Sequence, residues 1–186
     1  MDEEKNPLKK KRNNAGFTLA ETLMAMLIML MVTAIVAAGI PVARNAYEGV
    51  VLASNSELLL STTLSALRNE LGTAKNIECK DGGKEIRYYN PSAKITSCIF
   101  LNDEKATEGI QFQRYAAADI LGNKGAEGNR LVTWAASNKN LYVTYRSASF
   151  SNGIVTFTDI SVNMEDGSRT DLATRDSYSI RVLSYE

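Results

Sequence analysis

The pattern of apolar and charged residues divides the chain into a strongly apolar run near the N-terminus and a remainder in which apolar, polar and charged residues alternate. No charged residue occurs from Thr22 to Ala43. At a helical rise of about 1.5 Å per residue this run reaches roughly 33 Å, which matches a hydrocarbon core about 30 Å thick. The run is therefore predicted to be a helix that can span a bilayer.

The helical pattern continues beyond the uncharged run. Leucines recur at spacings of four, three and four residues, which places them on one helix face, and they are Leu60, Leu64, Leu67 and Leu71. Gly72 is a suitable stop. Pro41 removes one helical hydrogen bond, so a kink or local melting is expected over residues 37–41. The pattern predicts one long helix from Phe17 to about Leu71, apolar in its first half and amphipathic in its second.

After residue 75 the pattern changes to short runs rich in β-branched and aromatic residues, separated by Gly, Asn, Asp and Ser. A hairpin turn is expected at Asn90-Pro91-Ser92, and the leucine face of the helix needs a sheet to cover it. The fold class is therefore predicted as α+β, with the long N-terminal helix packed against an antiparallel β-sheet domain. The candidate strands are Glu85–Tyr89, Ile95–Leu101, Ile110–Tyr115, Leu131–Ala135, Leu141–Tyr145, Ile154–Val162 and Tyr178–Leu183.

Charge and composition narrow the function classes. Lys+Arg and Asp+Glu both number 21 and there is no histidine. A neutral chain lacks the basic footprint of nucleic-acid binding, so no nucleic-acid partner is predicted. Without histidine the commonest general base and metal ligand are missing, which disfavours an enzyme, a metal site or a cofactor. Basic residues gather just before the apolar run, at Lys9, Lys10, Lys11 and Arg12, and such clusters stay on the cytoplasmic side of a membrane.

The junction between the basic cluster and the apolar run contains a carboxylate. It reads Ala15-Gly16-Phe17-Thr18-Leu19-Ala20-Glu21. A secretory signal peptide is one alternative, with a cleavage site at Ala37-Ala38-Gly39, but its apolar core is usually 7–15 residues and carries no acid. The junction resembles instead the class III signal of type IV prepilins and type II secretion pseudopilins. In that family the leader ends in glycine, the mature chain begins with an apolar residue, and its fifth residue is glutamate.

The resemblance implies how these residues act. A prepilin peptidase would cut between Gly16 and Phe17 on the cytoplasmic side, and the Phe17 amine would be N-methylated. In a filament, the amine of one subunit would meet the Glu21 carboxylate of a neighbour and fix the register of their helices. The alternative for Glu21 is a tolerated acid near a helix start, favoured by the helix dipole. The chain would then consist of a leader (1–16), a transmembrane and polymerisation helix (17–43) and an extracytoplasmic pilin-like domain (44–186).

The expected function is a non-enzymatic subunit, a minor pilin or pseudopilin, of a type IV pilus-like or type II secretion-like filament. The resemblance implies further partners: other pilin or pseudopilin subunits, an inner-membrane assembly platform with its ATPase, and the bilayer before assembly. The subunit would begin in the cytoplasmic membrane and end in an extracellular or periplasmic filament. The rival hypothesis is a single-pass membrane-anchored binding module or enzyme that uses the helix only as a tether.

Three other features stay open. A disulfide between Cys79 and Cys98 would close a loop and stabilise the fold by about 3 kcal/mol, but in a flat three-stranded meander both cysteines would lie on outer strands, too far apart to bond. The glycine-rich segment 122–128 fits no phosphate-binding motif and is expected to be a loop. The acidic segment 165–176 lacks the spacing of an EF-hand, so a solvated loop is favoured over calcium binding.

Overall fold

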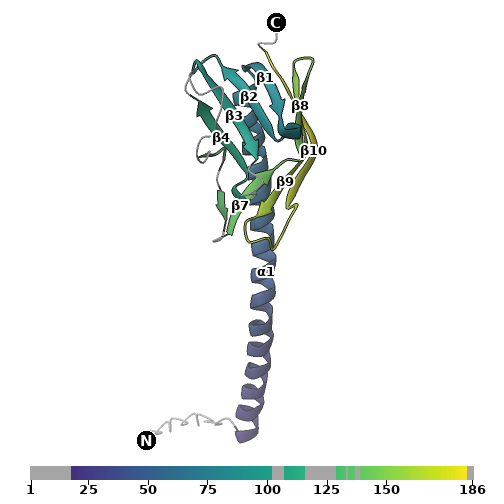
Figure 1. The fold of residues 1–186 in the computed structure, drawn as a ribbon. Helices are drawn as coiled ribbons and strands as arrows, with labels where there is room; N and C mark the ends of the chain where they lie inside the picture. The colour runs from purple at the N-terminus through teal and green to yellow at the C-terminus, as the bar shows by residue number, and fades with distance from the viewer. Residues whose placement is uncertain (1–17, 102–106, 116–128, 133, 137–138, 184–186) are drawn as a thin grey trace, which may run out of the picture. The chain divides into compact units, whose positions relative to one another are not determined.

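The computed structural model describes residues 18–101, 107–115, 129–132, 134–136 and 139–183. The chain divides into two units, residues 1–47 and 48–186. The first described element is the helix α1, Leu19–Leu71, which begins in the first unit and ends in the second. Its end at Leu71, directly before Gly72, confirms the predicted stop. Figure 1 shows the C-terminal part of α1 lying along the strands of the second unit.

The described residues after α1 form two antiparallel sheets. The first has the strand order β1-β2-β3-β4-β5, and the second has the order β10-β9-β7-β6 with β8 also paired to β9. A long apolar helix packed with antiparallel sheets confirms the predicted α+β, pilin-like fold class. The bounds of the first sheet are β1 Lys75–Lys80, β2 Glu85–Asn90, β3 Ile95–Leu101, β4 Ile110–Tyr115 and β5 Asn129–Arg130, with the short 3-10 helix η1 at Asp81–Gly83. Those of the second are β6 Trp134–Ala136, β7 Lys139–Thr144, β8 Ser147–Ser151, β9 Ile154–Met164 and β10 Ala173–Arg181.

Most of the predicted strands are confirmed, and three strands were missed. The missed strands are β1, β5 and β8. The predicted strand Leu131–Ala135 is wrong in its first half, because Leu131 and Val132 form a bend and β6 starts at Trp134. The predicted turn after β2 is confirmed: the Asn90 side-chain oxygen accepts hydrogen bonds from the backbone N–H groups of Ser92 (3.0 Å) and Ala93 (3.1 Å). This is the way in which Asn stabilises a tight turn.

The leucine face of α1 is in the core, as its spacing predicts. Leu60, Leu67 and Leu71 are at most 1% exposed, and Leu64 is half-buried against the same core. The face is wider than the leucine pattern indicates, because Ser56 and Thr63 are also buried. Each of these hydroxyls donates to the carbonyl one turn earlier at 2.8 Å, which satisfies it inside the apolar core.

The prediction of local melting of the helix at residues 37–41 is wrong. Helix α1 continues through Pro41 without interruption. Proline leaves the carbonyl four residues earlier, that of Ala37, without its usual N–H partner. A helix can absorb that loss with a modest bend, so a bend at this point stays a prediction.

The two cysteines belong to different strands and to opposite faces of the first sheet. Cys79 on β1 is paired with Ile86 on β2, whereas Cys98 on β3 is paired with Arg87. Because paired residues share a face and neighbouring residues alternate, the two thiols point to opposite sides, with β2 between their strands. No disulfide joins Cys79 and Cys98. Of the two alternatives left open by the sequence, the meander without a disulfide is the one that the structure contains.

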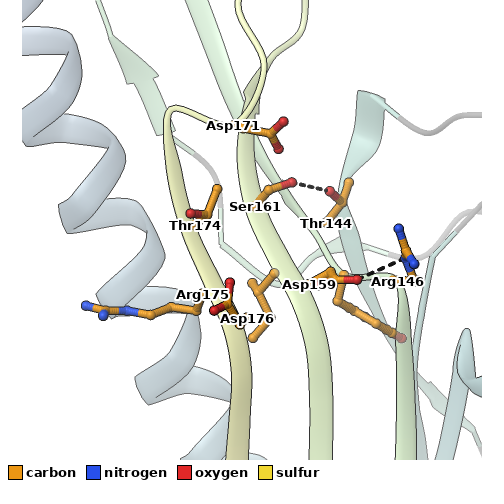
Figure 2. A pocket seen from close by; sticks show the side chains of 10 residues that line it. Thr144, Arg146, Asp159, Ser161, Asp171, Thr174, Arg175 and Asp176 are labelled. Carbon is orange, nitrogen blue, oxygen red and sulfur yellow. Dashed lines mark hydrogen bonds and ion pairs between the residues drawn. The ribbon is translucent and has the colours of Figure 1, made fainter.

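The second sheet is irregular at one point on its central strand β9. Strands β7 and β8 pair with β9 one after the other, and the two residues between them, Tyr145 and Arg146, lie opposite Asp159 and Ile160. Asp159 has a positive φ of 49°. Its carboxylate forms an ion pair with the Arg146 guanidinium at 3.0 Å, which Figure 2 shows as a dashed line. The Tyr145 ring turns into the core and meets the Phe157 ring edge-on, with centroids 5.2 Å apart.

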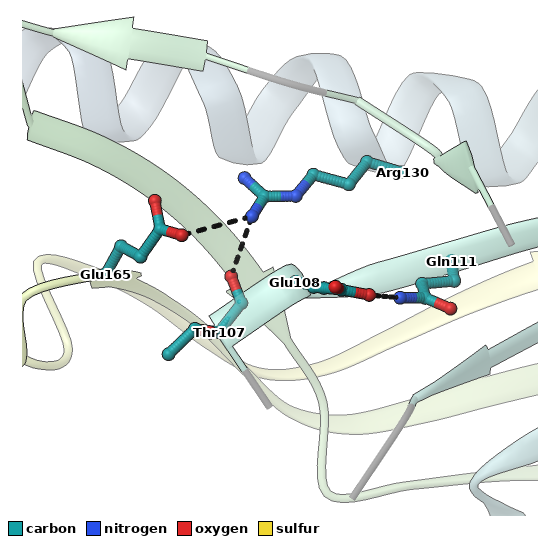
Figure 3. A network of polar contacts seen from close by, with 5 residues as sticks. All are labelled: Thr107, Glu108, Gln111, Arg130 and Glu165. Atoms are coloured by element: carbon teal, nitrogen blue, oxygen red, sulfur yellow. Dashed lines mark hydrogen bonds and ion pairs between the residues drawn. The ribbon is translucent and has the colours of Figure 1, made fainter. Parts of the chain in front are cut away.

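Polar contacts connect the two sheets. Arg130 on β5 donates to the Thr107 carbonyl (3.3 Å) and to the Glu165 carboxylate in the turn after β9 (3.4 Å), as Figure 3 shows. Beside them Gln111 donates to the carboxylate of Glu108. At another point the hydroxyl of Tyr145, which directly follows β7, donates to the carbonyl of Lys84, which directly precedes β2, at 2.8 Å. These contacts fix the sheets to each other within the second unit.

Candidate functional site at the start of the N-terminal helix

The first turn of α1 is closed by a reciprocal pair of hydrogen bonds. Glu21 Oε2 accepts from the backbone N–H of Thr18 at 2.8 Å and from the Thr18 hydroxyl at 3.0 Å. In return the Thr18 hydroxyl oxygen accepts from the backbone N–H of Glu21 at 3.3 Å. This is a capping box, in which a Thr and a Glu three residues later satisfy two N–H groups that the helix start leaves without partners.

The capping box gives Glu21 a local role that sequence reasoning missed. The signal was present, since Thr18-Leu19-Ala20-Glu21 directly before an apolar run is the sequence signature of a capping box. Both hydrogen bonds that the carboxylate accepts from Thr18 use Oε2. Within the described residues, Oε1 is left to accept from a donor outside the chain.

Among the residues that the structure describes, none covers the apolar part of α1. Every residue from Thr18 to Glu48 is exposed, including Leu19 (81%) and Met29 (75%). An 18-residue window of the helix has a mean hydropathy of 2.6 and is 0% buried, so by length and composition α1 can cross a membrane. So large an apolar surface needs lipid or protein to cover it. An apolar N-terminal helix of this kind suggests membrane anchoring, as in prepilins.

The remaining predicted site residues are distributed unevenly over the structure. Gly16, Phe17 and the basic cluster at Lys9, Lys10, Lys11 and Arg12 lie outside the described residues, as does the glycine-rich segment 122–128. The acidic segment 165–176 forms the turn between β9 and β10 and the start of β10. In the turn, Asp166 Oδ1 accepts from the Ser168 N–H at 2.9 Å and from its hydroxyl at 2.7 Å. Across the described parts of the chain, no three His, Cys, Asp or Glu side chains meet in a way that would hold a metal ion.

Comparison with known proteins identifies the N-terminal segment. Residues 11–37 match the model of the prokaryotic N-terminal methylation motif. No curated protein and no solved structure matches this chain. The match lies across the junction with Gly16, Phe17 and Glu21 and includes most of the apolar run.

The chain therefore carries a type IV pilin-like prepilin signal. Such a signal implies processing by a prepilin peptidase and assembly with pilin subunits. A motif of this kind indicates a structural protein.

Proposed function

We propose that the chain is a structural subunit, a minor pilin or a pseudopilin, of a type IV pilus-like or type II secretion-like filament. The observation that carries the proposal is the coincidence of two features on one helix. The methylation motif covers residues 11–37, and the part of α1 that follows its junction, as far as Ala43, is apolar and exposed on all sides. A tether for an enzyme or a binding module would need the second feature but not the first.

Processing sets the termini of the mature subunit. Cleavage between Gly16 and Phe17 removes the leader, residues 1–16, and leaves a Phe17 amine for methylation. Residues 17–43 then span the cytoplasmic membrane, with the domain of residues 44–186 on the extracytoplasmic side, because the basic residues before Phe17 are retained in the cytoplasm. The peptidase is a separate protein, and this chain is its substrate rather than an enzyme.

Glu21 directs assembly by pairing with the N-terminal amine of an adjoining subunit. The capping box supports this role, because Thr18 holds the carboxylate at the helix start through Oε2. An ionised carboxylate in apolar surroundings is costly unless a positive group is near, so a wrongly staggered neighbour is disfavoured. The pair therefore selects the register between helices more than it adds stability.

Assembly exchanges one apolar environment for another. In the bilayer, lipid covers the exposed face of α1, and in the filament the helices of other subunits cover it. Since lipid tails are as apolar as leucine, packing and polar contacts decide the balance. The energy for extraction comes from an assembly platform in the inner membrane and its ATPase. The filament is extracellular or periplasmic.

The first test is the N-terminus of the mature protein. The chain is produced together with a prepilin peptidase, purified from membranes and analysed by intact mass and N-terminal peptide mass spectrometry. We expect a chain that begins at Phe17 with a methylated amine, and an uncut precursor when Gly16 is replaced by a bulky residue. A cut after Ala38 or an intact leader in the presence of the peptidase would show that the helix is a signal or a tether.

The second test separates the charge of Glu21 from its capping role. Glu21→Gln keeps an acceptor for the Thr18 N–H but removes the negative charge, whereas Thr18→Val keeps the charge and removes the capping hydroxyl. We expect filament yield, measured by electron microscopy and by immunoblotting of sheared fractions, to be lost in Glu21→Gln and Glu21→Ala and only reduced in Thr18→Val. If Glu21→Gln assembles as well as the unmodified chain, the carboxylate acts as a cap and the pairing is refuted.

A further inference from the structure

The start of α1 lies directly after the bond between Gly16 and Phe17. Thr18 is the last residue before the helix, and α1 begins at Leu19. The Thr18 carbonyl accepts the first hydrogen bond of the helix, from the backbone N–H of Thr22 at 3.2 Å. Thr18 is therefore the N-cap residue, the position at which helical backbone torsions begin only with the next residue.

The capping box competes directly with a longer helix. The Thr18 N–H donates to Glu21 Oε2 at 2.8 Å, whereas in a helix that extended toward the leader it would donate to the carbonyl of Asn14. The Glu21 N–H donates to the Thr18 hydroxyl at 3.3 Å, whereas in the longer helix it would donate to the carbonyl of Phe17. Extension of the helix across the junction would therefore have to break the bonds of the capping box.

The residues around the junction would otherwise favour extension. Ala15 belongs to the strongest helix-forming residue type, and the long run after Thr18 already supplies the helix nucleus, so that extension needs only propagation. At the edge of a bilayer, peptide groups without a hydrogen-bond partner are costly, which favours the helix further. Gly16 opposes extension, but a single glycine inside a helix is tolerated. A stop signal at Thr18 is therefore what sets the boundary.

Hydrolysis of the bond requires a free Gly16 carbonyl. In the reaction a water oxygen bonds to the Gly16 carbonyl carbon, the C–N bond breaks and a proton goes to the Phe17 nitrogen. The products are a carboxylic acid and an amine, which ionise at neutral pH. In a helix that ran through the junction, the Gly16 carbonyl oxygen would accept from the Ala20 N–H. That oxygen would then be unavailable to the groups with which a peptidase stabilises the developing negative charge.

We propose that Thr18 is a positioning residue for processing: its capping box with Glu21 ends α1 two residues after Gly16 and so keeps the scissile bond accessible to the peptidase. This role rests on the proposed function. Independently of the hydrogen bonds, the methylation-motif match over residues 11–37 includes the bond, the cap and the helix start. Glu21 then acts twice, through Oε2 before the cut and through its charge in assembly.

The first measurement is the rate at which a purified prepilin peptidase cuts the full precursor in micelles, below saturation and followed by intact mass. Thr18→Val keeps the shape of the side chain and removes the capping hydroxyl. It should slow cleavage roughly 2-fold to 30-fold, which corresponds to the about 0.5–2 kcal/mol that an N-cap contributes. Thr18→Ser and Thr18→Asn restore a cap with different side chains and should restore the rate.

Thr22→Val is the matched control. The Thr22 hydroxyl donates to the Leu19 carbonyl at 2.8 Å in the same turn, but it caps no N–H group, so this variant should be cut at the unmodified rate. Glu21→Gln keeps an oxygen for the Thr18 N–H and should be cut nearly normally, although its filament yield is expected to be lost. Processing without assembly in Glu21→Gln separates the two roles of this residue.

The second measurement reports on the scissile bond itself. Gly16 is the one glycine in the sequence that is followed by phenylalanine. Labelling with carbonyl-13C glycine and 15N phenylalanine therefore gives a single carbonyl–nitrogen NMR correlation, that of the bond between residues 16 and 17. Its carbonyl shift should have a non-helical value in the unmodified precursor and should move toward helical values in Thr18→Val.

Three outcomes would overturn the proposal. The first is an unmodified cleavage rate in Thr18→Val. The second is a rate as slow in Thr18→Ser and Thr18→Asn as in Thr18→Val, because the peptidase would then recognise threonine itself. The third is the same carbonyl shift in the unmodified chain and in Thr18→Val. If the unmodified precursor is not cut at this bond, the proposed function fails, and the carbonyl shift alone decides whether Thr18 ends the helix.

Discussion

The junction between the two sheets makes a sharp prediction at Gly83. This residue ends η1, between β1 and β2, and packs against β8 of the other sheet. A Cβ atom added there would be 2.4 Å from the Ala148 carbonyl oxygen and 2.7 Å from its nitrogen. Both are backbone atoms, which cannot rotate out of the way. The residue beside it, Gly82, also has a positive φ but has open space where a Cβ would be added, so it is a matched control.

The two substitutions to alanine share one cost and differ in another. Both place an L-residue at positive φ, 63° at Gly82 and 91° at Gly83, which costs about 1–2 kcal/mol. Gly83→Ala adds the overpacking against β8, which costs about 1–3 kcal/mol where the surroundings must shift. The expected losses of unfolding free energy are therefore about 1–2 kcal/mol for Gly82→Ala and about 2–5 kcal/mol for Gly83→Ala.

The assay is thermal unfolding of the full chain in micelles, followed by near-UV circular dichroism. For a domain of this size each 1 kcal/mol lowers the Tm by roughly 2–4 °C. We expect a clear Tm difference between the two variants, with Gly83→Ala the lower. Equal Tm values would mean that β8 is not held against η1 as the structure has it, and the account of how the sheets join would be refuted.

Two further predictions concern the core and the thiols. Leu67→Ala, at a fully buried position, should lower the unfolding free energy by about 2–5 kcal/mol. Leu58→Ala, at a position that is 48% exposed, is the control and should change the unfolding free energy little. Urea unfolding, followed by fluorescence, measures both variants. Burial raises the pKa of the half-buried Cys79 thiol, so less thiolate forms at pH 8 and iodoacetamide should label this residue slowly. The buried Cys98 should react only when the protein unfolds. A Cys79–Cys98 disulfide, detected in the intact mass, would contradict the structure.

Sequence patterns predicted the elements whose side chains carry a strong signal. The leucine spacing predicted the core face of α1, and runs such as Ile95–Leu101 and Ile110–Tyr115 predicted their strands to the residue. Strand β8 was missed because its five residues alternate only Ala148 and Phe150 with serines, which resembles a loop. Strand β1 was missed because lysines and Glu78 surround Ile77. In both strands pairing with a neighbour overrides weak propensity.

The N-terminal site and the irregular point of β9 differ in how far sequence could predict them. Residues Gly16, Phe17 and Glu21 are close in the chain, so their motif is readable, and the partner of Glu21, Thr18, is only three residues away. The irregular point of β9 instead lies among three strands, β7, β8 and β10, that pair with β9 over long sequence distances. There Asp159 has a positive φ, which no local pattern in an otherwise regular strand indicates. Long-range register and one backbone torsion therefore had to come from the structure.

The two parts of helix α1 differ in exposure, and this difference separates the two jobs of the helix, which are membrane insertion or assembly in the first part and packing of the domain in the second. From Thr18 to Glu48 the side chains are exposed all round, which is the pattern of a helix that lies in lipid or among other helices. From Ser56 onward one face is buried by the sheets and the other is polar or exposed. Apolar substitutions such as Met29→Ala should therefore alter membrane partitioning or assembly and leave the Tm of the domain unchanged, because no domain contact is lost. A domain Tm that falls with Met29→Ala would show that the two jobs are coupled.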